Sequence, residues 1–193
     1  MTWNRITSWY PIYQAPITYY YRIADNNVYL GDEIVGTTSE VYQQAQDLAN
    51  LGQSSDDVEV IPEPSDQWLP LGVFAVIANL GDEPEIMVQL ALDRSGNIAG
   101  SYFNAPAGVV LPIVGSVQQE TQRAAWKIGK EDQIIMQTGI DNLSKDSSSV
   151  LIFFPDGTSE TWTLQRQSEE KAKDFIDKIE PPVEVENVEE AKP

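Results

Sequence analysis

The sequence predicts a mainly β fold, an eight-stranded antiparallel meander that closes into a small up-and-down, calycin-like barrel. Between residues 68 and 166, short apolar runs alternate with a period of two, and Gly, Pro, Asn and Asp interrupt them at regular intervals. The connections are too short for the crossing links of a sandwich, so consecutive strands are expected to pair. Closure would remove the exposed edges, and an open, strongly curved sheet is the alternative.

Three runs show which face of the predicted strand is buried, because apolar and polar side chains alternate in residues 85–93, 123–129 and 158–166. The inward-facing residues are expected to be Ile86, Val88, Leu90 and Leu92 in the first run, Ala124, Trp126 and Ile128 in the second, and Trp162 and Leu164 in the third. Arg123, Ala125 and Lys127 are expected to point outward from the second run.

The remaining strands are placed at residues 71–78, 97–104, 109–119, 132–139 and 147–154. Two of the connections carry specific turn chemistry. Residues 94–97 (Arg-Ser-Gly-Asn) and 155–158 (Pro-Asp-Gly-Thr) each place a Gly where a tight hairpin needs a positive φ. The hairpin also explains the oxygen-rich sequence that begins at Asp93, which lacks the later Glu of a calcium loop.

The first 36 residues are rich in Trp and Tyr, which bury large areas and carry a polar group. This segment is therefore expected to lie over another surface, either the barrel or a protein partner. The candidate interaction surface consists of Trp3, Trp9, Tyr10 and Tyr13. Further along, strands are expected at residues 17–23, 27–30 and 33–35, which would form a small hairpin unit.

A helix is expected after this hairpin. Thr37 and Glu40 have the spacing of a capping box, and Val41, Ala45 and Leu48 form one apolar face before Gly52 ends the helix. Residues 1–52 are thus predicted to form an aromatic segment, a β-hairpin and one helix.

The other predicted regions follow from composition. Residues 53–66 are acidic, contain two prolines and are expected to be a linker, and residues 67–166 are expected to form an independently folded barrel domain. Residues 168–180 are predicted to form an amphipathic helix, capped by Ser168, and residues 181–193 an acidic disordered tail. The apolar stripe of that helix is Ala172, Phe175, Ile176 and Ile179.

Composition excludes several kinds of function. A formal net charge of −18 would repel nucleic acid, and no apolar run is long enough for a transmembrane segment. The chain has no His and no Cys, so it lacks the usual general base, thiol nucleophile and transition-metal ligands. The carboxylate pairs Asp82/Glu83 and Glu131/Asp132 are expected to be solvated loop charges. We therefore predict no catalytic residue, no cofactor and no metal.

Three segments resemble a family of uncharacterised bacterial proteins: residues 68–75 (WLPLGVFA), 89–96 (QLALDRSG) and 122–129 (QRAAWKIG). The resemblance covers residues 17–166 and includes residues 138–146 (TGIDNLSKD). Many members are exported, and some are labelled mu-protocadherin-like or cell-surface proteins. The resemblance implies a periplasmic, cell-surface or secreted location, although no leader is visible here and the cytoplasm remains the alternative. It implies no catalytic or ligand-binding residue.

Two functions from different classes are consistent with the sequence. The first is a non-enzymatic structural or protein-interaction module of the bacterial envelope, with a protein partner bound through the aromatic N-terminal segment. The second is a barrel that holds a small apolar molecule or lipid. We favour the first because four bulky side chains are expected to fill the barrel, namely Phe74, Trp126, Phe153 and Trp162.

Overall fold

The computed structural model describes residues 1–52, 67–79, 81–129 and 134–179 of the chain. The predicted linker (53–66), the predicted tail (181–193) and the Glu131/Asp132 pair lie outside the described residues, as do the first two residues of the strand predicted at 132–139.

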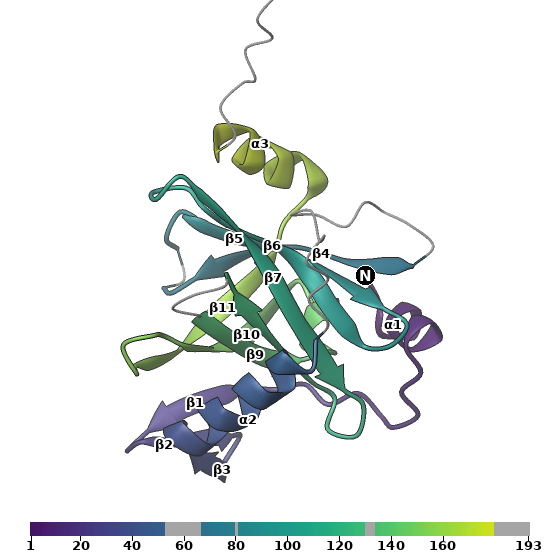
Figure 1. Cartoon of the computed structure of the whole chain (residues 1–193), viewed down its shortest axis with the longest axis vertical. Coiled ribbons are helices and arrows are strands. Elements are labelled where there is room, and N and C mark those ends of the chain that lie inside the picture. The colour runs from purple at the N-terminus through teal and green to yellow at the C-terminus, as the bar shows by residue number, and fades with distance from the viewer. Residues whose placement is uncertain (53–66, 80, 130–133, 180–193) are drawn as a thin grey trace, which may run out of the picture.

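The predicted closed barrel is confirmed (Figure 1). Its strands pair antiparallel in the order β10-β11-β4-β5-β6-β7-β8-β9, and pairing of β10 with β9 closes the ring. Most strand boundaries agree with the predicted ones to within about two residues, and β4 begins three residues earlier than expected. The barrel strands are β4 (Trp68–Ile77), β5 (Ile86–Asp93), β6 (Asn97–Asn104), β7 (Val109–Gln118), β8 (Arg123–Ile128), β9 (Ile134–Gly139), β10 (Ser147–Phe153) and β11 (Ser159–Arg166).

Both predicted hairpin turns are present, and an Asp side chain stabilises each. Asp93 Oδ1 accepts hydrogen bonds from the backbone N–H groups of Ser95 and Asn97, and Gly96 has a φ of 91°. In the second turn the Asp156 carboxylate accepts from the N–H of Thr158. These turns connect neighbouring strands directly, as a meander requires.

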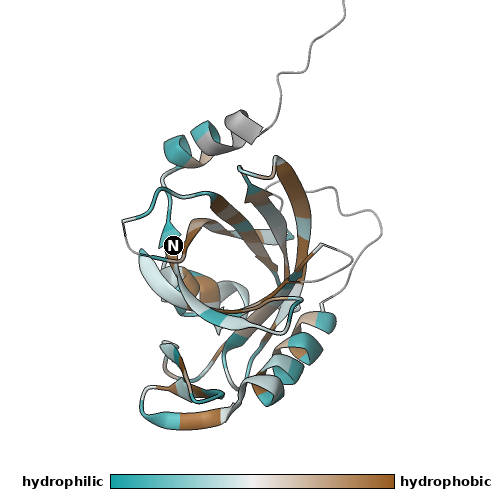
Figure 2. Ribbon diagram, turned by 90° about the vertical axis from the view of Figure 1, so that its left-hand side faces the viewer, coloured by the Kyte–Doolittle hydropathy of each residue, from teal (hydrophilic) through white to brown (hydrophobic). Residues whose placement is uncertain are grey.

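The inward faces predicted for β5 and β8 are confirmed. Val88, Leu90 and Leu92 join Ala124, Trp126 and Ile128 in one buried cluster, with Ile86 packed at its edge. Leu164 of β11 is fully buried in the same cluster, whereas Trp162 is only partly buried near the end of the barrel. Figure 2 shows that hydrophobic residues are concentrated in the barrel strands.

The expectation for Phe153 was wrong, because this ring lies outside the barrel. In β10, Val150 and Ile152 point inward, while Leu151 and Phe153 belong to a second cluster on the outer face. From Val150 to Phe153 both faces of β10 are buried and every residue is apolar, so alternation cannot identify the inward side there.

The second cluster joins the barrel to an N-terminal unit made of β1 (Tyr21–Ala24), β2 (Asn27–Leu30), β3 (Glu33–Thr37) and α2 (Thr38–Asn50). We call the junction of this unit with β8–β10 the seam. The three strands form a separate sheet in the order β1-β2-β3. β1 is shorter than the strand expected at 17–23, since residues 17–20 run extended without a paired strand.

The C-terminal end of α2 packs closely on β7. The Ser116 hydroxyl donates to the Leu48 carbonyl at 2.6 Å, which satisfies one of the carbonyls left free at the helix end. A Cβ atom added to Gly52 would lie 2.2 Å from the carbonyl oxygen of Gly115, so glycine is needed at this contact. The N-terminal unit is therefore fixed to the barrel at both the seam and β7.

The predicted capping box of α2 is confirmed. The N–H of Glu40 donates to Thr37 Oγ1 at 3.2 Å, and the Glu40 carboxylate accepts from the Thr37 N–H at 2.8 Å. This backbone hydrogen bond, with a second from the Thr37 hydroxyl, lowers the pKa of Glu40 below its usual value. The carboxylate's stabilising contribution is therefore present above that value and is lost as the pH falls through the lowered pKa.

We expect Thr37→Ala to reduce the free energy of unfolding by about 1 kcal/mol, the usual cost of losing an N-cap hydroxyl. Urea unfolding at pH 7 measures this loss. Because the substitution leaves the backbone N–H of residue 37 in place, part of the Glu40 interaction should survive in the variant. A loss below about 0.3 kcal/mol would show that the cap does not stabilise α2.

Two further helices and one short turn complete the described fold. The helix α1 (Trp3–Trp9) was not predicted, since only seven residues are helical and their apolar pattern is short. Thr2 caps it by accepting from the Arg5 N–H. The C-terminal helix α3 (Glu169–Ile179) is confirmed and buries Ala172 beside the barrel. A 3-10 turn, η1 (Asn142–Ser144), lies between β9 and β10.

Candidate functional site

The predicted interaction surface is divided by the structure. Trp3, Trp9 and Tyr10 are partly buried against the barrel core, whereas Tyr13 is 89% exposed. The Arg94 guanidinium lies 4.0 Å from the centre of the Trp9 ring, and the Tyr10 hydroxyl donates to the Val117 carbonyl. The first three rings therefore contact the barrel itself, and Tyr13 alone among the four is open to a partner.

The helix α1 closes one end of the barrel. Ile6 is fully buried and Ile12 is 6% exposed, and both belong to the same cluster as Trp126. The same cluster includes Ile140 and Leu143, which come from the β9–β10 connection. The N-terminal segment thus contributes directly to the barrel core.

The extended segment from Ala15 to Tyr19 is held by side chains in place of a strand. Gln122 accepts from the Ile17 N–H and donates to the Ala15 carbonyl, both at 2.8 Å. Asn142 accepts from the Tyr19 N–H at 2.8 Å and donates to the Tyr19 carbonyl at 2.7 Å. These buried amides therefore have a structural task, and they reproduce the hydrogen bonds of a neighbouring strand.

The buried acid Asp141 also has a structural role. Asp141 accepts from the Thr18 hydroxyl at 2.6 Å and forms an ion pair with Lys145 at 3.1 Å. Asn142 also begins a glycosylation sequence motif, but it is fully buried and its amide is fully engaged. Neither residue is available for chemistry or modification in the folded protein.

The barrel interior is occupied by side chains. Four large side chains are each at most 1% exposed and belong to one continuous cluster, namely Phe74, Leu90, Ile113 and Trp126. The Trp126 ring has no exposed surface, although its Nε1–H has no hydrogen-bond partner. An interior packed in this way resembles the core of a small barrel more than a ligand cup.

At the opposite end from α1, a pocket of about 370 Å³ lies beside Trp162 and the β4–β5 loop. Asp82, Glu83 and Glu85 line it together with apolar residues. Asp82 accepts from Asn79, which is consistent with the predicted solvated loop charge. Within the described ranges, no three acidic residues are grouped so as to hold a metal ion.

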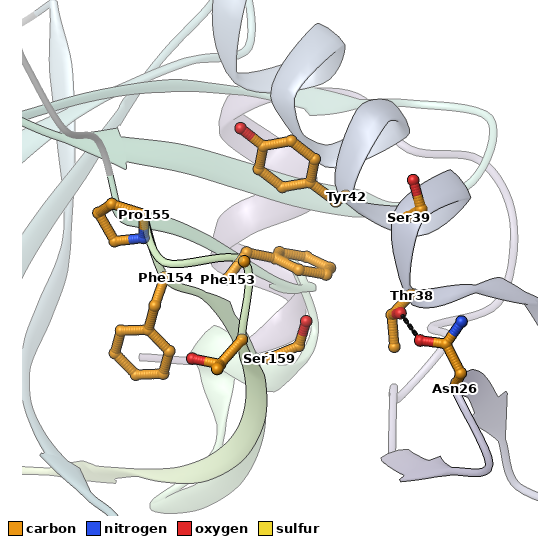
Figure 3. Close-up of a pocket in the computed structure, with 10 residues that line it drawn as sticks. Asn26, Thr38, Ser39, Tyr42, Phe153, Phe154, Pro155 and Ser159 are labelled. Carbon is orange, nitrogen blue, oxygen red and sulfur yellow. Dashed lines mark hydrogen bonds between the residues drawn. The ribbon is translucent and has the colours of Figure 1, made fainter.

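Two pockets lie along the seam. The first, which we call the hairpin pocket, has a volume of about 400 Å³ and lies between the start of α2 and the β10–β11 turn. Figure 3 shows Tyr42, Thr38 and Ser39 of α2 with Asn26 on one side, and the hairpin residues on the other. Thr38 donates to Asn26 at 2.6 Å, and the Tyr42 hydroxyl accepts from Gln46. Several polar groups of this pocket are thus already paired within the protein.

The second, which we call the Arg123 pocket, has a volume of about 280 Å³ and lies between α2, the three-stranded sheet and β8–β9. Its apolar wall comprises Leu30, Val35 and Val41. Its polar lining comprises Tyr19, Tyr21, Gln44, Thr121, Arg123 and Gln137. The residues come from six separate parts of the chain, so no sequence motif marks the pocket.

Unlike the hairpin pocket, the Arg123 pocket contains buried polar atoms that have no hydrogen-bond partner. The Nε atom of Arg123 and the Oε1 atom of Gln137 are buried and have no hydrogen-bond partner. Arg123 instead donates from Nη1 to Gln44 Oε1 at 2.8 Å, and from Nη2 to Gln118 Oε1 at 3.5 Å. In the described part of the chain, no carboxylate forms an ion pair with this guanidinium.

The two tyrosines of the pocket remain protonated near neutral pH. Burial raises the pKa of both Tyr19 and Tyr21, although Arg123 opposes the rise. The Tyr21 hydroxyl accepts from Gln137 Nε2 at 2.8 Å, and the Tyr19 hydroxyl donates to the Thr121 carbonyl. The pocket therefore combines one cation, two neutral phenols and an aliphatic wall.

Comparisons with known proteins add no relative, since searches of family models, curated proteins and solved structures found no match. None of the described helices is long and apolar enough to cross a membrane.

Proposed function

We propose that the protein is a non-enzymatic binding module in which the barrel is a rigid scaffold and recognition takes place on its outer surface. The observation that carries this proposal is the packed interior around Trp126, which α1 closes at one end. A carrier of the lipocalin type needs internal space for its guest. The seam, by contrast, has pockets that are open to solvent and one that contains unpaired polar groups.

A protein partner is the kind of ligand that best fits the exposed apolar residues of the N-terminal region. Tyr13, Tyr20 and Ile34 are 89%, 65% and 58% exposed, and aromatic residues are enriched in interfaces. Tyr13 and Tyr20 flank the segment that Gln122 and Asn142 hold in place, so the backbone that carries both rings is anchored to the barrel.

We further propose that this module belongs to the bacterial family with the three motifs described above and works in the cell envelope or outside the cell. The support is the resemblance of residues 68–75, 89–96 and 122–129. The absence of His and Cys from the chain supports a role without catalysis. Fractionation of the native bacterium tests the location, and recovery of the protein in the cytoplasm alone would contradict it.

The binding proposal predicts which residues a partner needs. Tagged protein with Tyr13→Ser and Tyr20→Ser should recover at least about tenfold less partner from native cells. Two exposed rings near the centre of an interface contribute about 1–2 kcal/mol or more to the binding free energy. Leu51→Ser is the matched control, since Leu51 is 71% exposed at the far end of α2. Quantitative mass spectrometry of the recovered proteins measures the loss.

The same preparation decides between outer-surface recognition and an internal guest. Native mass spectrometry should give the mass of the chain without a stoichiometric apolar adduct. An adduct that survives purification and alters the fluorescence of Trp126 would contradict the proposal, because only an internal guest contacts that ring.

A further inference from the structure

We infer that the Arg123 pocket binds an aliphatic carboxylate, with the acid group on Arg123 and the hydrocarbon against Leu30, Val35 and Val41. This inference rests on the proposed outer-surface function and names the chemical class of ligand for one pocket of the seam. Two sources supply this chemistry: a small free acid, and the carboxyl-terminal residue of a polypeptide.

The cation is the first part of the argument. The chain carries 30 acidic and 12 basic residues, so its net charge repels an anion at long range. An anion would bind only where a cationic side chain is held in place and has hydrogen-bond donors free to contact it. Arg123 meets this condition, because its partners Gln44 and Gln118 are neutral and its Nε–H is unpaired. A guanidinium matches a carboxylate in shape and charge.

The unpaired amide of Gln137 is a second, independent observation. Gln137 is completely buried and lines the pocket, and one of its two polar atoms has no partner. Its Nε2 donates to the Tyr21 hydroxyl, which leaves Oε1 as an acceptor without a donor. An unpaired buried acceptor destabilises the protein, so a ligand N–H next to the carboxylate, such as a peptide terminus carries, would stabilise the complex by donating to Gln137 Oε1.

The apolar wall defines the rest of the ligand. Val41 is almost fully buried, whereas Val35 is 41% exposed at the rim, so a hydrocarbon chain would pass from the rim toward the acid-binding group. A volume of about 280 Å³ is close to the lower limit of ligand pockets. The pocket therefore suits one short aliphatic group and not a long lipid.

The test uses full-length protein labelled with 15N and three soluble probes: N-acetyl-leucine, its neutral amide N-acetyl-leucinamide, and octanoate. NMR titration at 0.15 M salt follows the side-chain amide of Gln137 and the indole N–H of Trp126. N-acetyl-leucine is expected to shift the Gln137 signal in a saturable way, and the amide probe is expected to bind about tenfold or more weakly because it lacks the charge. The Trp126 signal should not move.

The two sources differ in their second polar group. N-acetyl-leucine carries an N–H next to its carboxylate, as a peptide terminus does, whereas octanoate has none. Tighter binding of N-acetyl-leucine than of octanoate assigns the pocket to a polypeptide terminus. The reverse order assigns it to a free acid, and either order supports an aliphatic carboxylate.

Arg123→Gln should weaken the binding of N-acetyl-leucine by about 10- to 100-fold, since a hydrogen bond to a charged group contributes about 1.5–3 kcal/mol. Lys127→Gln is the matched control, because it removes the same charge from the same outward face of β8 while Lys127 contacts Asn50 outside the pocket. If Arg123→Gln fails to fold, Val35→Glu provides the second variant. It places a negative charge at the exposed rim and should lower affinity by a similar factor.

Three outcomes would overturn the inference: no saturable shift at Gln137 with any probe, equal binding of N-acetyl-leucine and its amide, or equal losses in the Arg123 and Lys127 variants. These outcomes leave the partner recovery through Tyr13 and Tyr20 intact, so they concern the pocket alone. Saturable shifts at Trp126 that persist in Arg123→Gln would contradict both the inference and the outer-surface function.

Discussion

Replacing Trp126 with Ala is expected to lower the free energy of unfolding by about 3–5 kcal/mol, the range for removing a large aromatic ring from a core. The ring is fully buried among strands on all sides of the barrel and belongs to the same cluster as Ile6 of α1. The variant would leave a cavity that α1 and the strands cannot fill without moving. Urea unfolding monitored by far-UV circular dichroism measures the loss.

Two variants separate the effect of the cavity from other effects. Trp126→Phe keeps most of the ring and removes an indole N–H that has no partner, so it should cost less than about 1.5 kcal/mol. Trp162→Ala should cost about 1–2 kcal/mol, because this ring is only partly buried at the end of the barrel and bonds Glu160. Equal losses at Trp126 and Trp162 would contradict a packed barrel centre.

A cavity in the barrel would also change what the protein can bind. If Trp126→Ala folds, the space left by the ring is apolar and enclosed, and such cavities take up small apolar molecules. The variant should then bind a probe such as benzene that the original protein excludes. This contrast would show directly that side chains, and not the barrel geometry, exclude a guest from the interior.

The strands of the barrel were predictable because most of them have one face buried by the core and one face that is more polar. In β8, Ala124 and Trp126 alternate with Arg123 and Lys127, so both the strand and its inward side follow from the sequence. In β10, Leu151 and Phe153 are buried by the N-terminal unit, which removes the alternation. The orientation of such a strand depends on contacts with a distant segment.

The candidate site could not be predicted for a similar reason. The sequence placed Arg123 on the outside of its strand, which is correct, but it did not show that α2 and the three-stranded sheet lie over it. Gln137 and Tyr21 are far apart in sequence and meet only when the N-terminal unit docks. The aromatic segment was identified from composition, but its division into rings that contact the barrel and the exposed Tyr13 depends on α1.

The docking of the N-terminal segment depends strongly on Asn142, and Asn142→Leu is expected to lower the free energy of unfolding by about 2–4 kcal/mol. Leu has a similar volume but cannot bond the Tyr19 N–H and carbonyl, which Asn142 contacts at 2.8 and 2.7 Å. Each of these buried groups would be left without its partner, at a cost of about 1–3 kcal/mol for each. Chemical unfolding measures the total loss.

Hydrogen exchange shows whether the loss arises where the structure places it. The Tyr19 amide should exchange faster in Asn142→Leu, while the Ile17 amide keeps part of its protection because Gln122 still accepts from it. Asn50→Leu is the matched control on the surface and should change stability by less than about 0.5 kcal/mol. Unchanged protection of Tyr19 would show that Asn142 does not hold the segment. If protection falls, the Arg123 pocket should lose affinity for N-acetyl-leucine as well, because Tyr19 and Tyr21 line it.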